Sequence, residues 1–208
     1  MAEAMAAIRA RHPGLREAVV ADARVAAQHR FERHEFRSAL DTLIQVVRLM
    51  WMSDAFLAQA LYRLKARLQA LGVPLLPRLA HKMAMQMAQV SVGDPVVMEP
   101  GVYIVHGQVV IDGLTEIKRG AIISPWVTIG LRGGELGGPT IGPNVNVGTG
   151  AKVLGNLTVG EGARIGANAV VIDDVAEAST VVGVPARPVA GGGQTAPDRS
   201  GATAGEAG

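Results

Sequence analysis

The chain has 208 residues, of which 49% are hydrophobic but only 3% aromatic, so any core must be built mainly from Ala, Val, Ile and Leu. It contains no Cys, which excludes disulfides, thiolate catalysis and zinc sites built on Cys. Residues 1–90 carry 13 Lys and Arg against 7 Asp and Glu, whereas residues 91–208 carry 7 against 11. The basic half has no cluster of the kind that follows a nucleic acid, so we expect a solvated helical surface and no nucleic-acid partner.

The sequence has no recognisable membrane signal. No apolar run approaches the ~18 residues that a membrane-spanning helix needs, and the N-terminus lacks the pattern of a secretory signal peptide. We therefore expect a soluble, cytoplasmic protein with no membrane partner.

The first 90 residues have the apolar spacing of amphipathic helices. Helix-forming residues fill positions 1–12, and a second pattern runs from about 15 to 31. The strongest run covers 39–71 and is divided by Ser53 and Asp54, which offer an N-cap. This half is therefore expected to be an all-α domain.

A last short helix is expected from residue 78 to about 88. The residues before it form a stop signal that consists of Gly72, Pro74 and Pro77. The methionines of this helix are expected to pack against a neighbouring helix, and these are Met83, Met85 and Met87.

A six-residue repeat begins after residue 90. Counting in sixes gives Val or Ile at eleven of twelve positions, namely Val105, Ile111, Ile117, Ile123, Ile129, Ile141, Val147, Val153, Val159, Ile165 and Val171. A displaced upstream copy, Val92, Met98 and Ile104, indicates that the register slips just before His106. The missing position, 135, lies in the Gly-rich stretch LRGGELGGPT, which we expect to be a loop over residues 131–140 that leaves the count intact.

The repeat predicts a solenoid of stacked coils. Each six-residue unit supplies one short strand and one turn, and three units close a triangular coil of 18 residues around an aliphatic ladder. The expected domains are a helical segment over 1–90, a parallel β-helix over 91–190 and a disordered tail over 191–208, where Gly, Ala, Ser and Thr dominate.

Several motifs of the repeat half resemble those of the serine O-acetyltransferase branch of the hexapeptide acyltransferases. They are GVYIVHG at 101–107, VTIG at 127–130, VGTGAKVLGNLTVGEGARIGANAVV at 147–171 and GVPAR at 183–187. The resemblance implies a left-handed β-helix that transfers an acetyl group from acetyl-CoA to the hydroxyl of L-serine, in cysteine biosynthesis. It also implies a homotrimer, or a dimer of trimers paired through the helical domain, and no metal.

The resemblance also implies roles for individual residues. His106 matches the catalytic histidine and would act as general base, since imidazole titrates near physiological pH. With no Cys available, the acceptor would attack the thioester directly. Acetyl-CoA would contact Gly130, Thr149, Arg164, Ala167 and Arg187, and the acceptor would contact Arg132, Asp112 and Trp126.

Two of these assignments stay open on the residues alone. Trp126 lies off the inward ladder, so it would line the acceptor pocket or fill a contact between subunits. The carboxylate that orients His106 would be Asp94, Glu99 or Asp112.

The sequence departs from the family pattern at three places. Val105 stands where the family has an acidic residue before the histidine, and Ser91 stands where it has an aspartate fifteen residues upstream. The loop lacks the family's Arg-His pair and offers only Arg132. These departures leave two alternatives to serine acetylation, which are a different acceptor (a sugar, another amino-acid derivative or a carrier-bound intermediate) and a non-catalytic β-helix scaffold.

The remaining histidines lack the spacing of a helical metal pair. They are His12, His29, His34 and His81. We expect them to be surface residues, and we expect no metal site.

Overall fold

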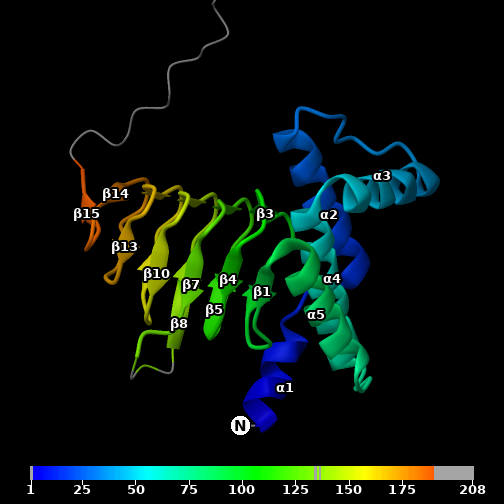
Figure 1. Cartoon of the computed structure of the whole chain (residues 1–208), viewed down its shortest axis with the longest axis horizontal. Helices are drawn as coiled ribbons and strands as arrows, with labels where there is room; N and C mark the ends of the chain where they lie inside the picture. The colour runs from blue at the N-terminus through cyan, green and yellow to red at the C-terminus, as the bar shows by residue number, and fades with distance from the viewer. Residues whose placement is uncertain (1, 134, 136, 190–208) are drawn as a thin grey trace, which may run out of the picture.

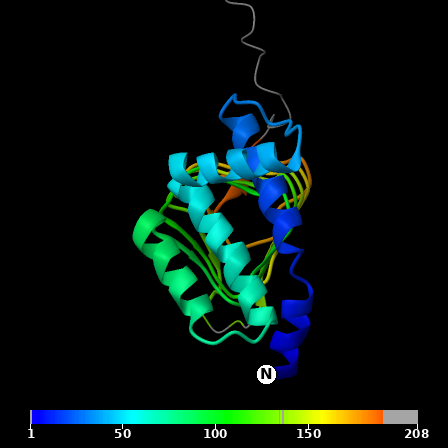
Figure 2. The same ribbon diagram turned by 90° about the vertical axis from the view of Figure 1, so that its right-hand side faces the viewer.

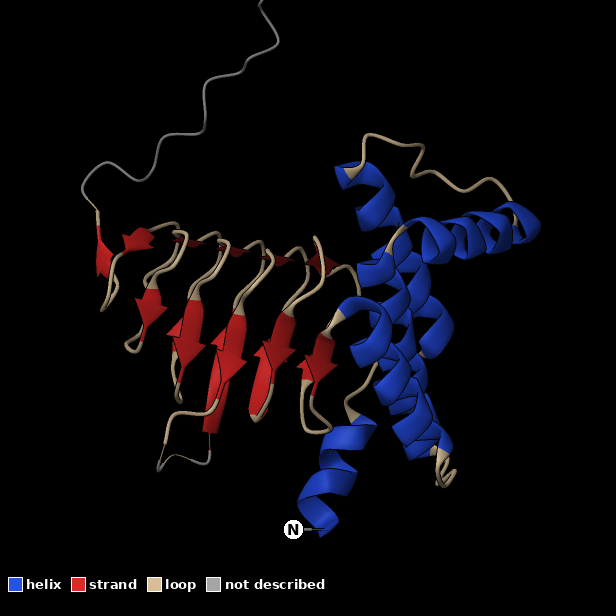
Figure 3. Cartoon of the chain, viewed as in Figure 1, coloured by secondary structure: helices blue, strands red, loops and turns tan. Residues whose placement is uncertain are grey.

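The computed structural model describes residues 2–133, 135 and 137–189. Figure 1 shows a group of helices packed against one end of a solenoid of strands, and Figure 3 shows that helices and strands occupy separate halves of the molecule. This order confirms the expected fold class of N-terminal helices followed by a β-helix. The expected disordered tail lies outside the described residues, as do positions 134 and 136 of the expected loop.

The helices follow the periodicity of the sequence. They are α1 (Ala2–Ala10), α2 (Leu15–His29), α3 (Ala39–Met52), α4 (Asp54–Ala70) and α5 (Leu76–Ala88). The hydroxyl of Ser53 accepts a hydrogen bond from the backbone N–H of Phe56 at 3.3 Å, so the expected division of the longest run is confirmed. No helix among the residues described here is long and apolar enough to cross a membrane.

The expectation for the methionines of α5 is wrong, because Met83, Met85 and Met87 are all exposed. The buried positions of this helix are instead Pro77, Ala80, Ala84 and Ala88. Such small side chains let α5 pack closely against its neighbours, and the longer methionine side chains then point to solvent.

The strands of the solenoid are short. They are β1 (Val90–Val92), β2 (Val97–Met98), β3 (Tyr103–Ile104), β4 (Val109–Ile111), β5 (Leu114–Ile117), β6 (Ile122–Ile123), β7 (Thr128–Gly130), β8 (Gly137–Ile141), β9 (Asn146–Val147), β10 (Lys152–Leu154), β11 (Thr158–Val159), β12 (Arg164–Ile165), β13 (Val170–Val171), β14 (Thr180–Val182) and β15 (Arg187–Pro188). They form three sheets with the orders β1-β4-β7-β10-β13, β2-β5-β8-β11 and β3-β6-β9-β12-β14-β15. All the pairs are parallel except β14 with β15.

The strand register confirms the 18-residue coil and the slip. Val110 pairs with Thr128, eighteen residues later, but in the first coil Tyr103 pairs with Ile122, nineteen residues later. The extra residue of the first coil lies in the turn between β3 and β4. Ile104 is consequently buried while Val105 is only half-buried, so the upstream copy of the ladder is correct and Val105 is not part of it.

The Gly-rich stretch interrupts the coil without disturbing the ladder. Thr128 pairs with Lys152, twenty-four residues later, which is one coil plus one extra six-residue unit. The expected loop is too long at its end, because β8 already begins at Gly137. A Cβ at Gly138 would lie 2.8 Å from the backbone of Leu114, so only glycine lets this segment pair so closely with β5.

A buried ion pair attaches the helices to the first coil. Arg63 of α4 contacts Asp22 of α2 at 2.9 Å, and its guanidinium also donates to the carbonyl of Met98 at 2.6 Å. The Asp22 carboxylate in turn accepts from the N–H of Gly101 at 2.8 Å. Figure 2 shows the helices lying across the open end of the coils. These contacts fix the middle of α2 and of α4 against the first turn of the solenoid.

Candidate active site

His106 lies in the turn between β3 and β4, and its side chain is exposed. The N–H of Gln108 donates to the carbonyl of Ala88 at 3.1 Å, so the turn is held against the C-terminus of α5. A Cβ at Gly107 would lie 1.9 Å from the same carbonyl oxygen, so only glycine fits there. The helical domain therefore determines the position of the histidine.

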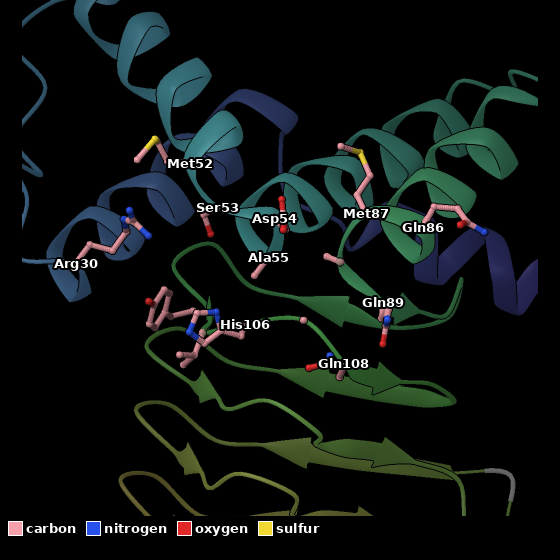
Figure 4. A pocket seen from close by; sticks show the side chains of 14 residues that line it. Arg30, Met52, Ser53, Asp54, Ala55, Gln86, Met87, Gln89, His106 and Gln108 are labelled. Atoms are coloured by element: carbon pink, nitrogen blue, oxygen red, sulfur yellow. The ribbon is translucent and has the colours of Figure 1, made fainter.

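A cavity of about 670 Å³ opens beside His106. It lies between the β3–β4 turn and the ends of α2, α4 and α5 (Figure 4). Its lining consists of Arg30, Met52, Ser53, Asp54, Ala55, Gln86, Met87, Ala88, Gln89, Tyr103, Val105, His106, Gly107 and Gln108. Of these only His106 was expected from the sequence, because the helix ends meet the turn through tertiary packing that no local motif signals.

Two opposite charges line this cavity. Arg30 ends α2, and its Nε donates to Glu32 at 3.0 Å. Figure 4 shows its guanidinium directed toward Ser53 and Asp54. Asp54 is the first residue of α4, where the helix dipole favours a carboxylate, and it is the only acidic side chain among the described residues of the lining. The cavity therefore offers one cation, one anion and the imidazole.

The three carboxylates considered as partners of His106 lie elsewhere. Asp94 pairs with Lys65 at 2.9 Å, Glu99 pairs with Lys118 at 3.3 Å, and an oxygen of Asp112 accepts from the N–H of Gly113 at 2.7 Å. Asp94 and Asp112 line a second cavity, together with Ser91, and none of the three lines the cavity of His106.

The Asp94 carboxyl is already committed to its own partner. Burial raises its pKa, but the hydrogen bond and charge of Lys65 outweigh burial and hold the pKa below its usual value. This lowered pKa indicates a structural ion pair between α4 and the first coil.

Trp126 lies one coil along from His106. The register of β4 with β7 equates Gln108 with Trp126, and the indole side chain is 58% exposed. Arg132 is exposed in the loop after β7, where Glu135 accepts a hydrogen bond from the N–H of Asn156 at 2.9 Å. Neither Trp126 nor Arg132 lines the cavity, and both lie on the side of His106 away from the helices.

The residues expected to contact acetyl-CoA lie on the coils beyond His106. Thr149 and Ala167 are exposed in the turns that follow β9 and β12, which is the same corner of the triangle as the turn of His106. Gly130 is buried at the end of β7, and Arg164 is exposed in β12. Arg187 is exposed and pairs with Asp173 at 3.2 Å.

Beyond Trp126, the next two coils carry only small residues at the tip of this corner, namely Thr149 and Ala167, each of which follows a glycine. A Cβ at Gly148 would lie 2.6 Å from the carbonyl of Ile165, and a Cβ at Gly166 would lie 2.7 Å from the side chain of Val182. Both positions therefore require glycine, which leaves a smooth edge along Thr149 and Ala167.

The comparisons with known proteins agree with this geometry. The family model "Bacterial transferase hexapeptide (six repeats)" matches residues 138–173. A soybean serine acetyltransferase complexed with serine is 30% identical with a TM-score of 0.71, and the match covers 85% of this chain and 70% of that one. The chain belongs to the serine acetyltransferase-like branch of the hexapeptide-repeat acyltransferases.

Further members of this family have similar structures. The serine acetyltransferase of Vibrio cholerae is 28% identical with a TM-score of 0.69, covering 89% of this chain and 69% of that one. A serine acetyltransferase in complex with CoA is 27% identical with a TM-score of 0.66, covering 82% and 68%. No curated protein matches this chain by sequence. Family membership makes the protein an acyltransferase and confirms the expected left-handed β-helix.

The expectation that the remaining histidines are surface residues is wrong for His12. Its two ring nitrogens are shielded from solvent and have no hydrogen-bond partner among the described residues. Burial, together with the positive charges of Arg63, Lys65 and Arg11, lowers its pKa from 6.5 to about 4. His29 is exposed as expected, and its ring stacks on Tyr103 with centroids 4.5 Å apart.

Proposed function

We propose that this protein is an acetyl-CoA-dependent O-acetyltransferase in which His106 is the general base. The observation that carries the proposal is the place of His106. Its imidazole is exposed at a fixed turn, with a cavity of about 670 Å³ on one side and, beyond Trp126, the small residues of the later coils on the other. A histidine in this position can contact an acceptor on one side and acetyl-CoA on the other.

The chemistry follows from this arrangement. Acetyl-CoA supplies an activated acetyl thioester. The imidazole of His106 accepts the proton of the acceptor hydroxyl while that oxygen attacks the carbonyl carbon. A C–O bond forms, the C–S bond breaks, and the imidazolium returns the proton to the departing sulfur. Asp54 is the one carboxylate in the cavity that can offset the transient positive charge on the ring.

Acetyl-CoA would lie along the corner of small residues. Thr149 and Ala167 would contact the pantetheine arm, and Gly130 would let it approach the backbone. The guanidinium groups of Arg164 and Arg187 are exposed on the coils that follow, where they can bind phosphates.

Serine is the first acceptor to consider, because the soybean relative is described as complexed with serine. Arg132 would then take part in serine binding from its loop, and the product would feed cysteine synthesis in the cytoplasm. A second acceptor class, a larger polyhydroxylated molecule, is favoured by the volume of the cavity beside His106 and by the loop, which contains no histidine.

We propose a homotrimer in which acetyl-CoA lies in the groove between adjacent β-helices, and we propose that two trimers pair through the helical domain. One face of α3 supports the pairing, because apolar side chains are exposed along it, namely Leu40, Leu43, Ile44, Val47 and Trp51.

An acceptor screen tests the proposed function. Release of CoA thiol from acetyl-CoA is measured without acceptor, with serine and with hydroxylated compounds including methyl glycosides, and products are identified by mass. We expect at least one acceptor to give an O-acetyl product. No turnover of serine at millimolar concentration would eliminate serine, and no product with any hydroxyl acceptor would contradict the proposed function.

A further inference from the structure

One corner of the β-helix varies along the coils in a way that backbone geometry does not explain. The register of β4, β7, β10 and β13 equates four turn residues, each with a left-handed backbone. They are Gln108 with φ 60°, Trp126 with φ 66°, Gly150 with φ 76° and Asn168 with φ 57°.

Left-handed φ angles favour Gly and, among other residues, Asn. The two coils farther from His106 follow this preference, with Gly150 and Asn168. The two coils at His106 instead carry Gln108 and Trp126, which gain nothing from this conformation. Trp126 is also 58% exposed, so its indole is not needed for the core. The backbone conformation explains neither side chain, and both are accessible for a contact outside the chain.

A second left-handed glutamine faces the same cavity. Gln89 ends α5 with φ 54°, and Figure 4 shows its side chain close to Gln108 on one side of the cavity. Gln86, one turn earlier in α5, also lines the cavity. A carboxamide donates and accepts hydrogen bonds, as does a hydroxyl group, so a row of amides suits a ligand with several hydroxyls.

The charge of the cavity disfavours an anionic ligand. Its lining holds one arginine, Arg30, and one acid, Asp54. Arg30 is already paired with Glu32.

The volume of the cavity and the exposed indole of Trp126 favour a large acceptor over a small one. The volume of about 670 Å³ lies within the range of sites that enclose drug-sized ligands, and serine would fill little of it. An exposed indole stacks on flat apolar surface, which a sugar ring has on its C–H face and serine lacks.

We infer that the acceptor contains a sugar-like hydroxylated ring that extends from the cavity, where Gln89 and Gln108 hydrogen-bond to its hydroxyls, to the next coil, where the indole of Trp126 contacts its C–H face. The ring places one hydroxyl at His106 for acetylation. This inference rests on the proposed O-acetyl transfer and adds the class of acceptor.

Acetylation of three probes tests the inference: methyl glucoside, methyl galactoside and N-acetylglucosamine. We expect at least one to be acetylated with higher kcat/KM than serine. In the Trp126→Ala variant, KM for that probe should rise about tenfold, and Trp126→Phe should restore most of the affinity. Asn144→Gly is the matched control, since Asn144 has φ 55° in another corner, and it should leave KM unchanged.

Stability separates a binding role from a structural one. Gln108→Gly removes a side chain from a left-handed position, so the Tm should stay constant or rise while KM for the probe rises. Binding is also measured without turnover in a Trp51→Phe background, where Trp126 is the remaining tryptophan. Titration with the probe should then change the fluorescence of Trp126.

Three results would overturn the inference. Serine turnover without acetylation of any probe would show that the acceptor is not a ring, while leaving the proposed O-acetyltransferase activity intact. An unchanged KM in both Trp126→Ala and Gln108→Gly would remove the assigned contacts. A lower assembly mass in Trp126→Ala, measured by light scattering, would place the indole in a contact between subunits.

Discussion

Gly107 shows how one residue without a side chain controls the position of its neighbour His106. Its backbone passes so close to Ala88 that any Cβ would overlap the carbonyl oxygen. Gly107→Ala must therefore push the turn, and His106 with it, away from α5. We expect kcat/KM to fall by about 10- to 100-fold with little loss of secondary structure. The control is Gly133→Ala, because a Cβ there meets nothing within 4 Å. Equal activity of the two variants would contradict this account of the turn.

Asp22 acts through its side chain, because its carboxylate is the buried counter-ion of the Arg63 guanidinium. Asp22→Asn leaves the buried guanidinium without its counter-ion, which should lower the free energy of unfolding by roughly 3–5 kcal/mol in urea denaturation. The comparison variant Asp41→Asn breaks the exposed pair with Arg33 and should cost much less. Similar losses in both variants would show that the buried pair is not the anchor of the helical domain.

At the scale of residues, the sequence predicted the ladder and His106 but not the walls of the cavity. The ladder is visible because its period is local. Arg30, Asp54, Gln89 and Gln108 come together only when α2, α4 and α5 dock on the first coil. The sequence identified Ser53 and Asp54 only as the start of a helix. It gave no indication that they also line the cavity.

At the scale of elements, α1 is joined to the rest of the molecule through a buried histidine. His12 follows α1, lies beside Tyr62 and faces the cations Arg63 and Lys65. Its pKa is about 4 in the folded chain and near 6.5 when unfolded. Between these values the unfolded chain binds a proton that the folded chain excludes, so stability should fall as the pH drops from 6.5 to 4.

A non-titrating variant isolates this contribution. The difference in unfolding free energy between the wild type and His12→Leu should change over this pH range and stay constant above pH 7. Urea denaturation at a series of pH values measures it. A constant difference throughout would mean that folding does not lower the pKa of His12.

The sequence predicted well those strands that follow the six-residue repeat. It did not predict those parts of elements whose position depends on packing against neighbouring elements. The strand register at Thr128 and Lys152 follows directly from the six-residue count. The start of β8 at Gly137 does not, because this Gly-rich segment pairs only through close contact with β5. The exposed face of α5 was missed for a related reason, since alanines make the contact and methionines remain outside.

At the scale of the whole molecule, the apolar face of α3 predicts assembly. Val47 and Trp51 are exposed on it, the latter at 87%. A charge there should weaken pairing of trimers without touching the site, so Val47→Asp should halve the mass measured by light scattering and keep the activity per chain. Leu71→Asp, at another exposed apolar position, is the control. An unchanged mass in Val47→Asp would remove α3 from the interface.

The central claim is that His106 removes the proton of the acceptor, and one measurement tests it most directly. The rate of CoA thiol release from acetyl-CoA is compared between the wild type and His106→Ala at saturating acceptor. We predict a fall in kcat of about 10²- to 10⁴-fold, with circular dichroism and assembly mass unchanged. An undiminished, acceptor-dependent rate in His106→Ala would contradict the account.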